Sequence, residues 1–539
     1  MSRQSFATDF ELNYQNIFSS ALPSDPLKTN EQRQVSKACF SYVKPKNCPN
    51  PKLIAHSNDT ASILDLTEQD CLSPLFLELV SGNYIPSKAQ PYAMRYGGHQ
   101  FGNWAGQLGD GRAINLTEIV NKKKELWTIQ LKGSGKTPYS RGADGLAVLR
   151  SSLREFLCSE AMFHLGVPTT RALSLTLTGE HVERDILYDG NPKLEPGAIT
   201  CRVAQNFIRF GNFEILAANS ELDELTSLID FCMEKYFCPK GFQPNLRKRQ
   251  KKMFYLEWFR EICIRTAHLI AKWMSFGFVH GVLNTDNMSI MGLTIDYGPY
   301  GWLEEYDPLW TPNTTDYQGR RYCYGRQPEI GLWNLTQLAN SLMPIISDKK
   351  ELERCLLCYH EVFSEEWNLL LSRKLGFRSF DQKLNPLFGK LFDFLPESRA
   401  DWTIFFRLLA KLDLSKANLA DMLTTLSDAF YDQEILQNAS VLRKMENWLS
   451  LYIQLNLELG KGSRKQLMNS VNPNFVLRNY LSQIAIDEAS AGNYTEIINL
   501  QSLLKTPFNE FKGESERYLR KRPKWANNKP GCSMLSCSS

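Results

Sequence analysis

The sequence predicts an α+β fold in which a small sheet comes first and a largely helical half follows. Two β-prone runs, 112–118 and 126–132, are joined by a polar turn, and residues 171–215 return to strand-like character. Between these strands, the apolar residues of 146–157 recur at helical spacing. The stretch 332–503 consists mostly of helical patterns, so the second half of the chain adds helices rather than strands.

Five segments follow one another along the chain. Residues 1–90 are mixed and turn-rich and form an N-terminal extension, and 91–215 contain a glycine-rich stretch with the predicted strands. The segment 216–345 contains a polar, basic loop at 241–252, then a helix from about Leu256 to Phe276, closed by Gly277, and then short strands and loops. Residues 346–512 are helical, and 513–539 form a polar, basic tail that we expect to be flexible.

Size and charge exclude several classes of protein. The 539 residues suffice for two or three domain-sized units, and 43% hydrophobic with 22% charged residues excludes a disordered chain. The 62 Lys and Arg against 58 Asp and Glu leave a net charge of only +4, too small to favour a nucleic-acid or anionic-membrane partner. No apolar run approaches the roughly 18 residues of a membrane span. We therefore expect a soluble protein that binds neither nucleic acid nor membrane. We also expect a monomer, although the sequence has no feature that settles the oligomeric state.

The cysteines and the N-terminus indicate an intracellular compartment. Thirteen cysteines, an odd number scattered along the chain, favour reduced thiols over a disulfide framework. Cys355 and Cys358 form a lone CxxC within a helical pattern, which indicates core thiols rather than a zinc site. The first residues lack an apolar signal core and carry Asp9 and Glu11, which is typical neither of a secretory signal nor of a transit peptide.

Two features of the first half suggest phosphate binding. The stretch 92–111 is crowded with glycine, which lets a backbone approach phosphates closely, although glycines also serve tight turns. Lys132 ends a predicted strand, and Glu155 on the following predicted helix is its candidate partner. Taken alone, each of these two charges is better explained as an ordinary solvated residue.

Two further features of the second half suggest a metal site. Asn287 and Asp296 stand at the two ends of a predicted tight hairpin, where their oxygens can converge on one Mg²⁺. The alternatives are a turn residue for Asn287 and a strand-end cap for Asp296. His280 follows a buried-looking helix and strand, which favours a structural histidine over a base.

The order of these features is that of a protein kinase, and it predicts a two-lobed kinase-like fold. His280 and Asn287 are seven residues apart, as the corresponding kinase residues are. Kinases carry the catalytic aspartate two residues after that histidine, but Val282 occupies this position and cannot accept a proton. Asp286 is the nearest carboxylate that can substitute. The chain is therefore either an inactive kinase scaffold or a kinase fold with different chemistry.

Long stretches of the sequence resemble the selenoprotein O family, whose bacterial members are also called YdiU. The matching segments are YGGHQFGNWAGQLGDGRA, LKGSGKTPYSRGADGLAVLRSSLREFL, CRVAQNFIRFGNFE, HGVLNTDNMSIMGLTIDYGPYG and QPEIGLWNL. The resemblance implies a kinase-like enzyme that binds ATP in an inverted orientation. It also implies transfer of AMP to Ser, Thr or Tyr hydroxyls of proteins, release of pyrophosphate, and dependence on Mg²⁺, with Mn²⁺ as an alternative.

The resemblance also implies roles for individual residues. Nucleotide-binding positions of the family match Gly109, Gly111, Arg112, Lys132, Asp144, Gly145, Glu155, Arg202, Arg209 and Asp296. Asp286 matches the proton acceptor, and Asn287 and Asp296 match the metal ligands. On spacing alone, the two arginines are explained as well by surface salt bridges. An inactive nucleotide-binding scaffold and an atypical kinase that uses Asp286 remain the alternative functions.

The tail and the compartment complete the expectations. Cys537 stands where animal members of the family often carry selenocysteine, and its thiol could exchange with Cys532 or Cys323. An exposed thiol without a partner is the alternative. Bacterial members are cytoplasmic and eukaryotic members mitochondrial, and the weak transit character predicts the cytoplasm for this chain, with the mitochondrion as the alternative if it is eukaryotic.

Overall fold

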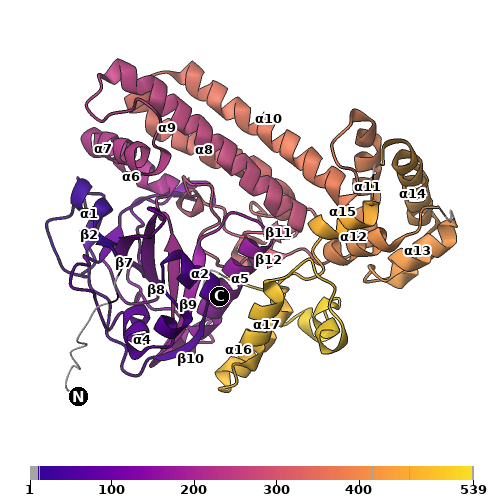
Figure 1. Cartoon of the computed structure of the whole chain (residues 1–539), viewed down its shortest axis with the longest axis horizontal. Coiled ribbons are helices and arrows are strands. Elements are labelled where there is room, and N and C mark those ends of the chain that lie inside the picture. Colours follow the sequence, from indigo (N-terminus) through magenta and orange to yellow (C-terminus); the bar gives the residue numbers. More distant parts are fainter. Residues whose placement is uncertain (1–9, 11, 416–417, 461, 537–539) are drawn as a thin grey trace.

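An antiparallel sheet forms the first half of the molecule. The computed structural model describes residues 10, 12–415, 418–460 and 462–536. Within these ranges eight strands pair in the order β2-β4-β7-β8-β10-β9-β3, with β1 added beside β7 (Figure 1). The strands are β1 (Tyr14–Gln15), β2 (Phe40–Tyr42), β3 (Lys52–His56), β4 (Tyr92–Met94), β7 (Ala113–Val120), β8 (Leu126–Lys132), β9 (Arg171–Arg184) and β10 (Lys193–Ala204). The predicted α+β class is confirmed, and three strands come from the first 90 residues.

Each face of the sheet has its own apolar core. On one face the buried side chains of Leu116, Ile129 and Leu131 pack against α2 to α4, which are α2 (Asn58–Ile63), α3 (Glu68–Cys71) and α4 (Pro74–Ser81). On the other face α5 (Leu149–His164) packs against β9 and β10. The central strands β7 and β8 bury apolar residues on the face toward α2 to α4 and polar residues such as Gln130 and Lys132 on the other, so a shift of register by one residue would exchange the two sets.

One predicted strand region is partly wrong. The strand-like stretch 171–215 ends at Ala204, and Phe210 begins the helix α6 (Phe210–Ala218). The run FEILAA holds the good helix formers Glu, Leu and Ala, and the Asn212 side chain accepts a 2.8 Å hydrogen bond from the Arg209 N–H at the helix start. Arg209 is the N-cap of this helix, so the start of α6 fixes the position of its backbone.

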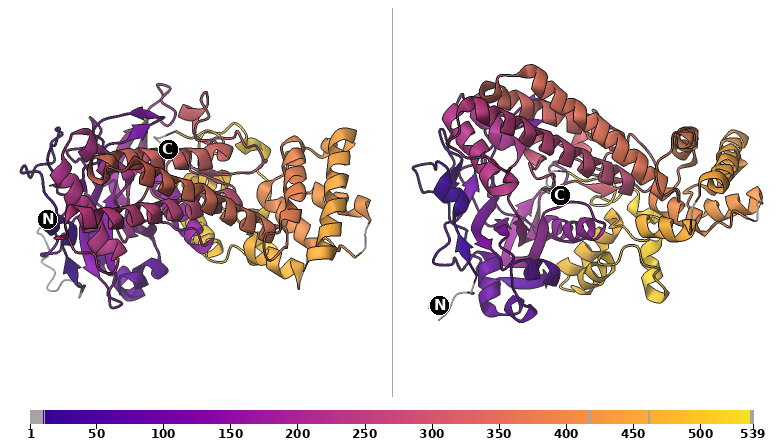
Figure 2. Two further views of the ribbon diagram at one scale, coloured as in Figure 1. Left: turned by 90° about the horizontal axis from the view of Figure 1, so that it is seen from above. Right: turned by 45° about the horizontal axis from the view of Figure 1, so that its top comes forward.

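Long helices form the centre of the second half. They are α7 (Leu222–Cys232), α8 (Lys248–Phe276), α9 (Gln327–Ile346) and α10 (Lys349–Lys374), and the last three lie side by side in Figures 1 and 2. Helix α8 ends at Gly277, whose φ is +73°, as the sequence predicts. It begins eight residues earlier than expected because Lys, Arg and Gln extend the helical run. Between α8 and α9 lie two short paired strands, β11 (Phe278–Val279) and β12 (Gly301–Trp302), and the loops of the site.

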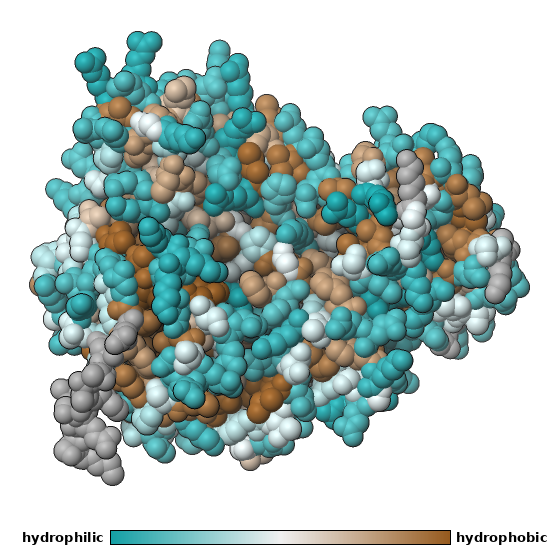
Figure 3. Space-filling model, in the orientation of Figure 1, coloured by the Kyte–Doolittle hydropathy of each residue, from teal (hydrophilic) through white to brown (hydrophobic). Residues whose placement is uncertain are grey.

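The remaining helices form an arm and then return to the sheet. The arm consists of α11 (Asn385–Ser398), α12 (Trp402–Lys411), α13 (Leu419–Ser427), α14 (Ala439–Leu459) and α15 (Arg464–Val471), and it extends away from the sheet in Figure 2. Helices α16 (Asn479–Ser490) and α17 (Thr495–Leu504) pack back against α5. On the face shown in Figure 3, hydrophilic residues predominate and hydrophobic ones form separate patches. Every helix in the described ranges is too short or too polar to cross a membrane.

The cysteines and the tail are also defined. None of the twelve cysteines among the described residues forms a disulfide, and Cys355 and Cys358 are buried on α10. Residues 513–536, expected to be a flexible tail, lie against the body: the Thr314 N–H donates to the Leu535 carbonyl at 2.7 Å, and Arg522 pairs with Glu304 at 2.7 Å. Cys537 lies outside the described residues.

Candidate active site

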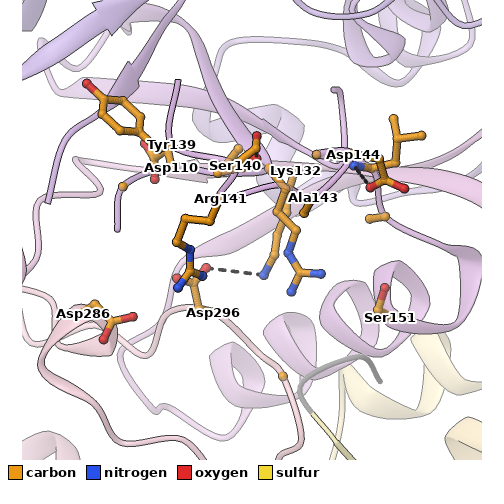
Figure 4. A pocket seen from close by; sticks show the side chains of 18 of the residues that line it. Asp110, Lys132, Tyr139, Ser140, Arg141, Ala143, Asp144, Ser151, Asp286 and Asp296 are labelled. Carbon is orange, nitrogen blue, oxygen red and sulfur yellow. Dashed lines mark hydrogen bonds and ion pairs between the residues drawn. The ribbon is translucent and has the colours of Figure 1, made fainter. Parts of the chain in front are cut away.

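A cleft of about 780 Å³ opens where the sheet meets the loops between α8 and α9. Figure 4 shows side chains from both halves pointing into it. Its lining includes every nucleotide-binding and metal-binding position suggested by the sequence except Glu155 and Arg209, namely Gly109, Gly111, Arg112, Lys132, Asp144, Gly145, Arg202, Asp286, Asn287 and Asp296. Glu155 and Arg209 lie directly behind this lining, because they contact Lys132, Arg202 and Asp296. The structure therefore brings the whole set together.

The glycine-rich loop is fitted tightly against a second loop. Gly109 has a φ of +94°, and a Cβ on it would lie 2.4 Å from the Tyr139 ring. A Cβ on Gly111 would lie 2.7 Å from the Tyr139 carbonyl oxygen, so neither position tolerates a side chain. The next residue, Arg112, lines the cleft and forms no ion pair with any described residue. The loop thus presents the Arg112 guanidinium next to backbone that no side chain covers.

Lys132 is held in place by Glu155 from α5. Its Nζ lies 2.8 Å from Glu155 Oε2 and 3.4 Å from Asp296 Oδ1, and Figure 4 shows Lys132 and Asp296 pointing toward each other. Burial lowers the pKa of Lys132, while the negative charges of Glu155 and Asp296 oppose that shift. Lys132 is the last residue of β8, so the strand fixes where its ammonium enters the cleft.

Two arginines from the end of β10 and the start of α6 bind the same aspartate. Arg202 Nη1 and Arg209 Nη1 donate to Asp296 Oδ1 and Oδ2 respectively, and Arg202 Nη1 also lies 2.9 Å from Glu155 Oε1. Burial by itself would raise the pKa of Asp296, but Arg209, Lys132 and Arg202 hold it well below its ordinary value. Asp296 is therefore ionised, and its two carboxylate oxygens are shared by three cations.

Asp286 is a buried carboxyl with one oxygen free of hydrogen bonds. Its Oδ2 accepts a 3.3 Å hydrogen bond from Gln100 Nε2, whereas Oδ1 has no hydrogen-bond partner among the described residues. A Cβ on Gly98 would lie 2.8 Å from that oxygen, so a glycine is needed beside it. Burial raises the pKa of Asp286 to about 6 even though Arg209 opposes the shift. The Arg209 guanidinium also donates to the Asp286 carbonyl at 2.8 Å and so fixes the backbone.

Asn287 and His280 have distinct roles in the same loop. Asn287 Nδ2 donates to the Val282 carbonyl at 2.7 Å, which leaves its amide oxygen available to a ligand. The ring of His280 is buried and its Nε2 lies 2.9 Å from the Ile295 carbonyl oxygen, and burial lowers its pKa. This geometry agrees with a structural histidine that supports the segment leading to Asp296.

Asp144 and Gly145 lie at the rim of the cleft. Arg184, the last residue of β9, binds both Asp144 carboxylate oxygens at 2.7 and 2.8 Å, and the Leu146 N–H donates to Oδ1 at 2.9 Å. Gly145 has a φ of +70°, and a Cβ there would lie 2.2 Å from the Gly135 carbonyl oxygen. Asp144 and Gly145 therefore hold the loop that leads into α5 in its tight conformation.

Several residues of the site carry no obvious signal in the sequence. Gln130 Oε1 accepts a 3.0 Å hydrogen bond from Arg202 Nε, and its position two residues before Lys132 on one strand face is the signal that could have found it. Asp110 is buried 3.9 Å from Arg209, and burial raises its pKa to about 6. Arg141 lines the cleft without an ion pair to any residue that the structure describes.

The donor set in the cleft suits a hard divalent cation. The Asn287 amide and the Asp296 carboxylate both offer oxygen ligands, which Mg²⁺ and Mn²⁺ prefer. Elsewhere in the described ranges, one cluster of Asp59, Glu160 and His164 brings three candidate ligand atoms together. Arg171 already binds Glu160 Oε1 at 2.9 Å, so that cluster is neutralised by a cation of the protein.

The comparisons with known proteins agree with one another. The family model described as "Protein adenylyltransferase SelO" matches residues 27–505. A protein of Methylobacillus flagellatus named "Protein nucleotidyltransferase YdiU" is 49% identical over 530 residues, which cover 98% of this chain and 100% of that protein. Proteins of the same name from Aromatoleum aromaticum and Tolumonas auensis are 51% and 50% identical, covering 97% and 98% of this chain and 99% of each relative.

Proposed function

The chain belongs to the SelO family, and from this premise we propose that it is a protein adenylyltransferase that transfers AMP from ATP to Ser, Thr or Tyr hydroxyls of proteins and releases pyrophosphate. The observation that carries the proposal is the convergence of Lys132, Arg202 and Arg209 on Asp296 in a cleft where Val282 stands at the position of a kinase base. The cleft can bind a triphosphate, yet it lacks the group on which ordinary γ-phosphate transfer depends.

We also propose a kinase-like, two-lobed arrangement for this site. In its favour, a glycine-rich loop, a strand lysine, a helix glutamate and the loops of Asn287 and Asp296 follow one another in kinase order, and Lys132 and Glu155 form the ion pair that kinases use. The boundaries at residues 90, 215, 345 and 512, the monomeric state and the cytoplasmic location remain predictions from the sequence.

The cations would act on the charge that develops during transfer. Negative charge builds on the triphosphate as pyrophosphate leaves, and donors fixed in advance stabilise it without reorganising. Lys132 is fixed by Glu155, and Arg202 is fixed by Glu155 and Gln130, so both are preorganised. The planar fork of each arginine matches phosphate oxygens in a way that lysine does not.

Asp286 would accept the proton of the incoming hydroxyl. A general base works best when its pKa lies near the working pH, and burial brings that of Asp286 to about 6. Its Oδ1 is buried and has no hydrogen-bond partner among the described residues, so its lone pairs would be free to accept the proton of a hydroxyl that reached it. Proton transfer to Oδ1 makes the acceptor oxygen a stronger nucleophile toward the α-phosphorus of ATP.

A divalent cation would be held by Asn287 and Asp296. Mg²⁺ is the first candidate and Mn²⁺ the alternative, because both ligand atoms are hard oxygens. When bound, such an ion neutralises charge on the phosphate oxygens. Asn287 is oriented for this by its hydrogen bond to Val282, and Asp296 by its position in the left-handed region with a φ of +55°.

Paired labelling with ATP tests this function against its alternatives. The full chain receives Mg²⁺, a protein acceptor mixture and ATP labelled at either the α- or the γ-phosphate, with Asp296→Ala as the inactive variant and the exposed Asp393→Ala as its matched control. We expect label in protein from the α position only, lost in Asp296→Ala and retained in Asp393→Ala. Label from γ only would indicate an atypical kinase, and intact nucleotide binding without label from either position would indicate a scaffold.

A further inference from the structure

A short hairpin from the glycine-rich segment covers the proposed base. Strands β5 (His99–Gln100) and β6 (Asn103–Trp104) are joined by Phe101 and Gly102, whose φ values are +51° and +84°. Both central residues of this two-residue turn have positive φ, as in a type I′ hairpin. The Phe101 N–H donates to the Tyr322 hydroxyl at 2.7 Å, and Gln100 donates to Asp286. The hairpin is thus fastened to the helical half beside Asp286.

The hairpin continues outward into a row of rings in tilted and edge-to-face contact, with one arginine at its end. The His99 ring lies 5.2 Å from that of Trp104 and 5.4 Å from that of Trp333 on α9. The Arg321 guanidinium lies 4.5 Å from the Trp333 ring, and a Cβ on Gly102 would lie 3.4 Å from its Cζ. Trp104 is 41% exposed although it is a large apolar side chain. We call His99, Trp104, Arg321 and Trp333 the aromatic row.

The row itself is held rigidly. Glu214 from α6 binds His99 Nδ1 at 2.8 Å and also accepts from the Thr285 hydroxyl, and the His99 N–H donates to Thr285 Oγ1 at 2.7 Å. Thr285 immediately precedes Asp286 in the chain. The buried Glu214 carboxylate therefore connects His99 of the aromatic row to Thr285 in the loop that carries Asp286. A molecule bound on the row would lie at a fixed position relative to Asp286.

The surface next to the row is positively charged. The segment 317–326 carries Arg320, Arg321 and Arg326 and no acidic residue, and none of the three forms an ion pair with a described residue. Arg320 lies over the Tyr317 ring at 5.6 Å, and Tyr317 is 64% exposed.

The acidic neighbours in the sequence form no ion pair with these arginines and offset their charge only in part. Both carboxylate oxygens of the buried Asp316 accept backbone N–H groups, from Arg321 at 3.0 Å and Tyr322 at 2.7 Å. Glu329, one turn before Trp333 on α9, forms no ion pair among the described residues. The charge of the arginines is therefore available to a partner.

We propose that the aromatic row and the arginines of 317–326 bind the acceptor protein through a segment in which Asp or Glu residues flank the target hydroxyl. This inference rests on the proposed function, because it supplies the acceptor for Asp286. Guanidinium groups stacked on rings lose little freedom when they pair with carboxylates, and the exposed indole offers apolar contact for the backbone and neighbouring side chains of the segment. Charge complementarity of this kind acts on encounter and on KM more than on the chemical step.

Peptides of opposite charge test this inference. Wild-type full chain, Mg²⁺ and α-labelled ATP are combined with peptides that carry the same hydroxyl flanked by glutamates or by lysines. We expect kcat/KM to be at least about tenfold higher for the glutamate peptide, mainly through KM. In the double variant Arg320→Glu with Arg321→Glu the preference should reverse, and the lysine peptide should become the better acceptor. A merely structural loss cannot produce this reversal.

The controls separate this inference from the function beneath it. Arg443→Glu, on an exposed position of α14, reverses the same charge away from the cleft and should leave the preference unchanged. Equal labelling of the two wild-type peptides, or an equal change in Arg443→Glu, would overturn the acceptor surface while leaving AMP transfer intact. Absence of α-label from every acceptor, proteins included, would overturn the proposed function and the acceptor surface together.

Discussion

Replacing Asp286 with asparagine should make the protein more stable while it abolishes transfer. The carboxyl is buried and its Oδ1 has no hydrogen-bond partner among the described residues, and burial raises its pKa from 3.8 to about 6. A carboxyl whose pKa is higher in the folded chain is destabilising once it ionises. The loss of folding stability is absent below the unfolded pKa, grows as the pH rises from about 4 to 6, and is constant above about pH 6. Asparagine keeps the shape of the side chain and removes the charge.

The size of the effect follows from the two pKa values. At 1.36 kcal/mol per pKa unit, the ionised carboxylate costs about 3 kcal/mol at pH 7 and less than about 1 kcal/mol at pH 4. The asparagine NH₂ group takes the place of an oxygen without a partner, which offsets roughly 1 kcal/mol of the gain. We therefore expect Asp286→Asn to stabilise the folded chain by about 2 kcal/mol at pH 7, a rise in Tm of a few degrees.

Thermal unfolding across pH 4 to 8, without metal or nucleotide, measures this difference. The Tm of Asp286→Asn minus that of the wild type should increase up to about pH 6 and then level off. The exposed Asp393→Asn on α11 serves as the control and should follow the wild type at every pH. A wild type more stable than Asp286→Asn at pH 7, or a difference independent of pH, would refute the argument that burial destabilises this carboxylate.

Four further outcomes are expected. Asp296→Asn should lose transfer yet bind metal-free ATP more tightly by calorimetry. Without the Asp296 charge, Lys132, Arg202 and Arg209 attract the triphosphate more strongly. Lys132→Met should slow single-turnover transfer by about 30- to 1,000-fold, as for loss of one transition-state donor, with an unchanged circular dichroism spectrum. Gly145→Ala should abolish nucleotide binding, whereas Gly142→Ala, also at positive φ but with open space around it, should retain it. Lys374→Met should raise the Tm at pH 7 and progressively less toward pH 10, because burial lowers the pKa of this lysine from 10.5 to about 7, and the resulting loss of stability is full below about pH 7 and fades as pH rises to the unfolded pKa.

The sequence predicts the elements that local patterns specify. The strand ending at Lys132 and the end of α8 at Gly277 agree with the structure, because alternation and a left-handed glycine are properties of a few adjacent residues. The neighbourhood of Lys132 and Glu155 was also expected, although only the structure supplies its 2.8 Å distance. The strands of the first 90 residues were not predicted: β1 has two residues and β2 three, too few for any periodicity, and the five residues of β3 begin within the turn-rich stretch 45–53.

The core of the site is not readable from spacing, because its contacts join distant parts of the chain. Arg202 and Arg209 are 94 and 87 residues from Asp296, and spacing explains them equally well as surface salt bridges. The structure buries both guanidinium groups instead. Asp110 is similar: it stands in the glycine-rich run without a signal of its own, and only the fold brings it 3.9 Å from Arg209. Long-range burial of charge, rather than local propensity, distinguishes these residues.

The sharing of Asp296 has a consequence for how substrates load. Both of its carboxylate oxygens accept guanidinium hydrogen bonds from Arg202 and Arg209, and Lys132 lies 3.4 Å from one of them. A carboxylate in this arrangement is a poor metal ligand, because three cations already compete for its oxygens and repel a fourth. In the proposed enzyme, a triphosphate that took the guanidinium donors would free the Asp296 oxygens and bring negative charge of its own. We therefore expect nucleotide and metal to favour each other's binding, with Asp296 available as a metal ligand only once ATP has bound.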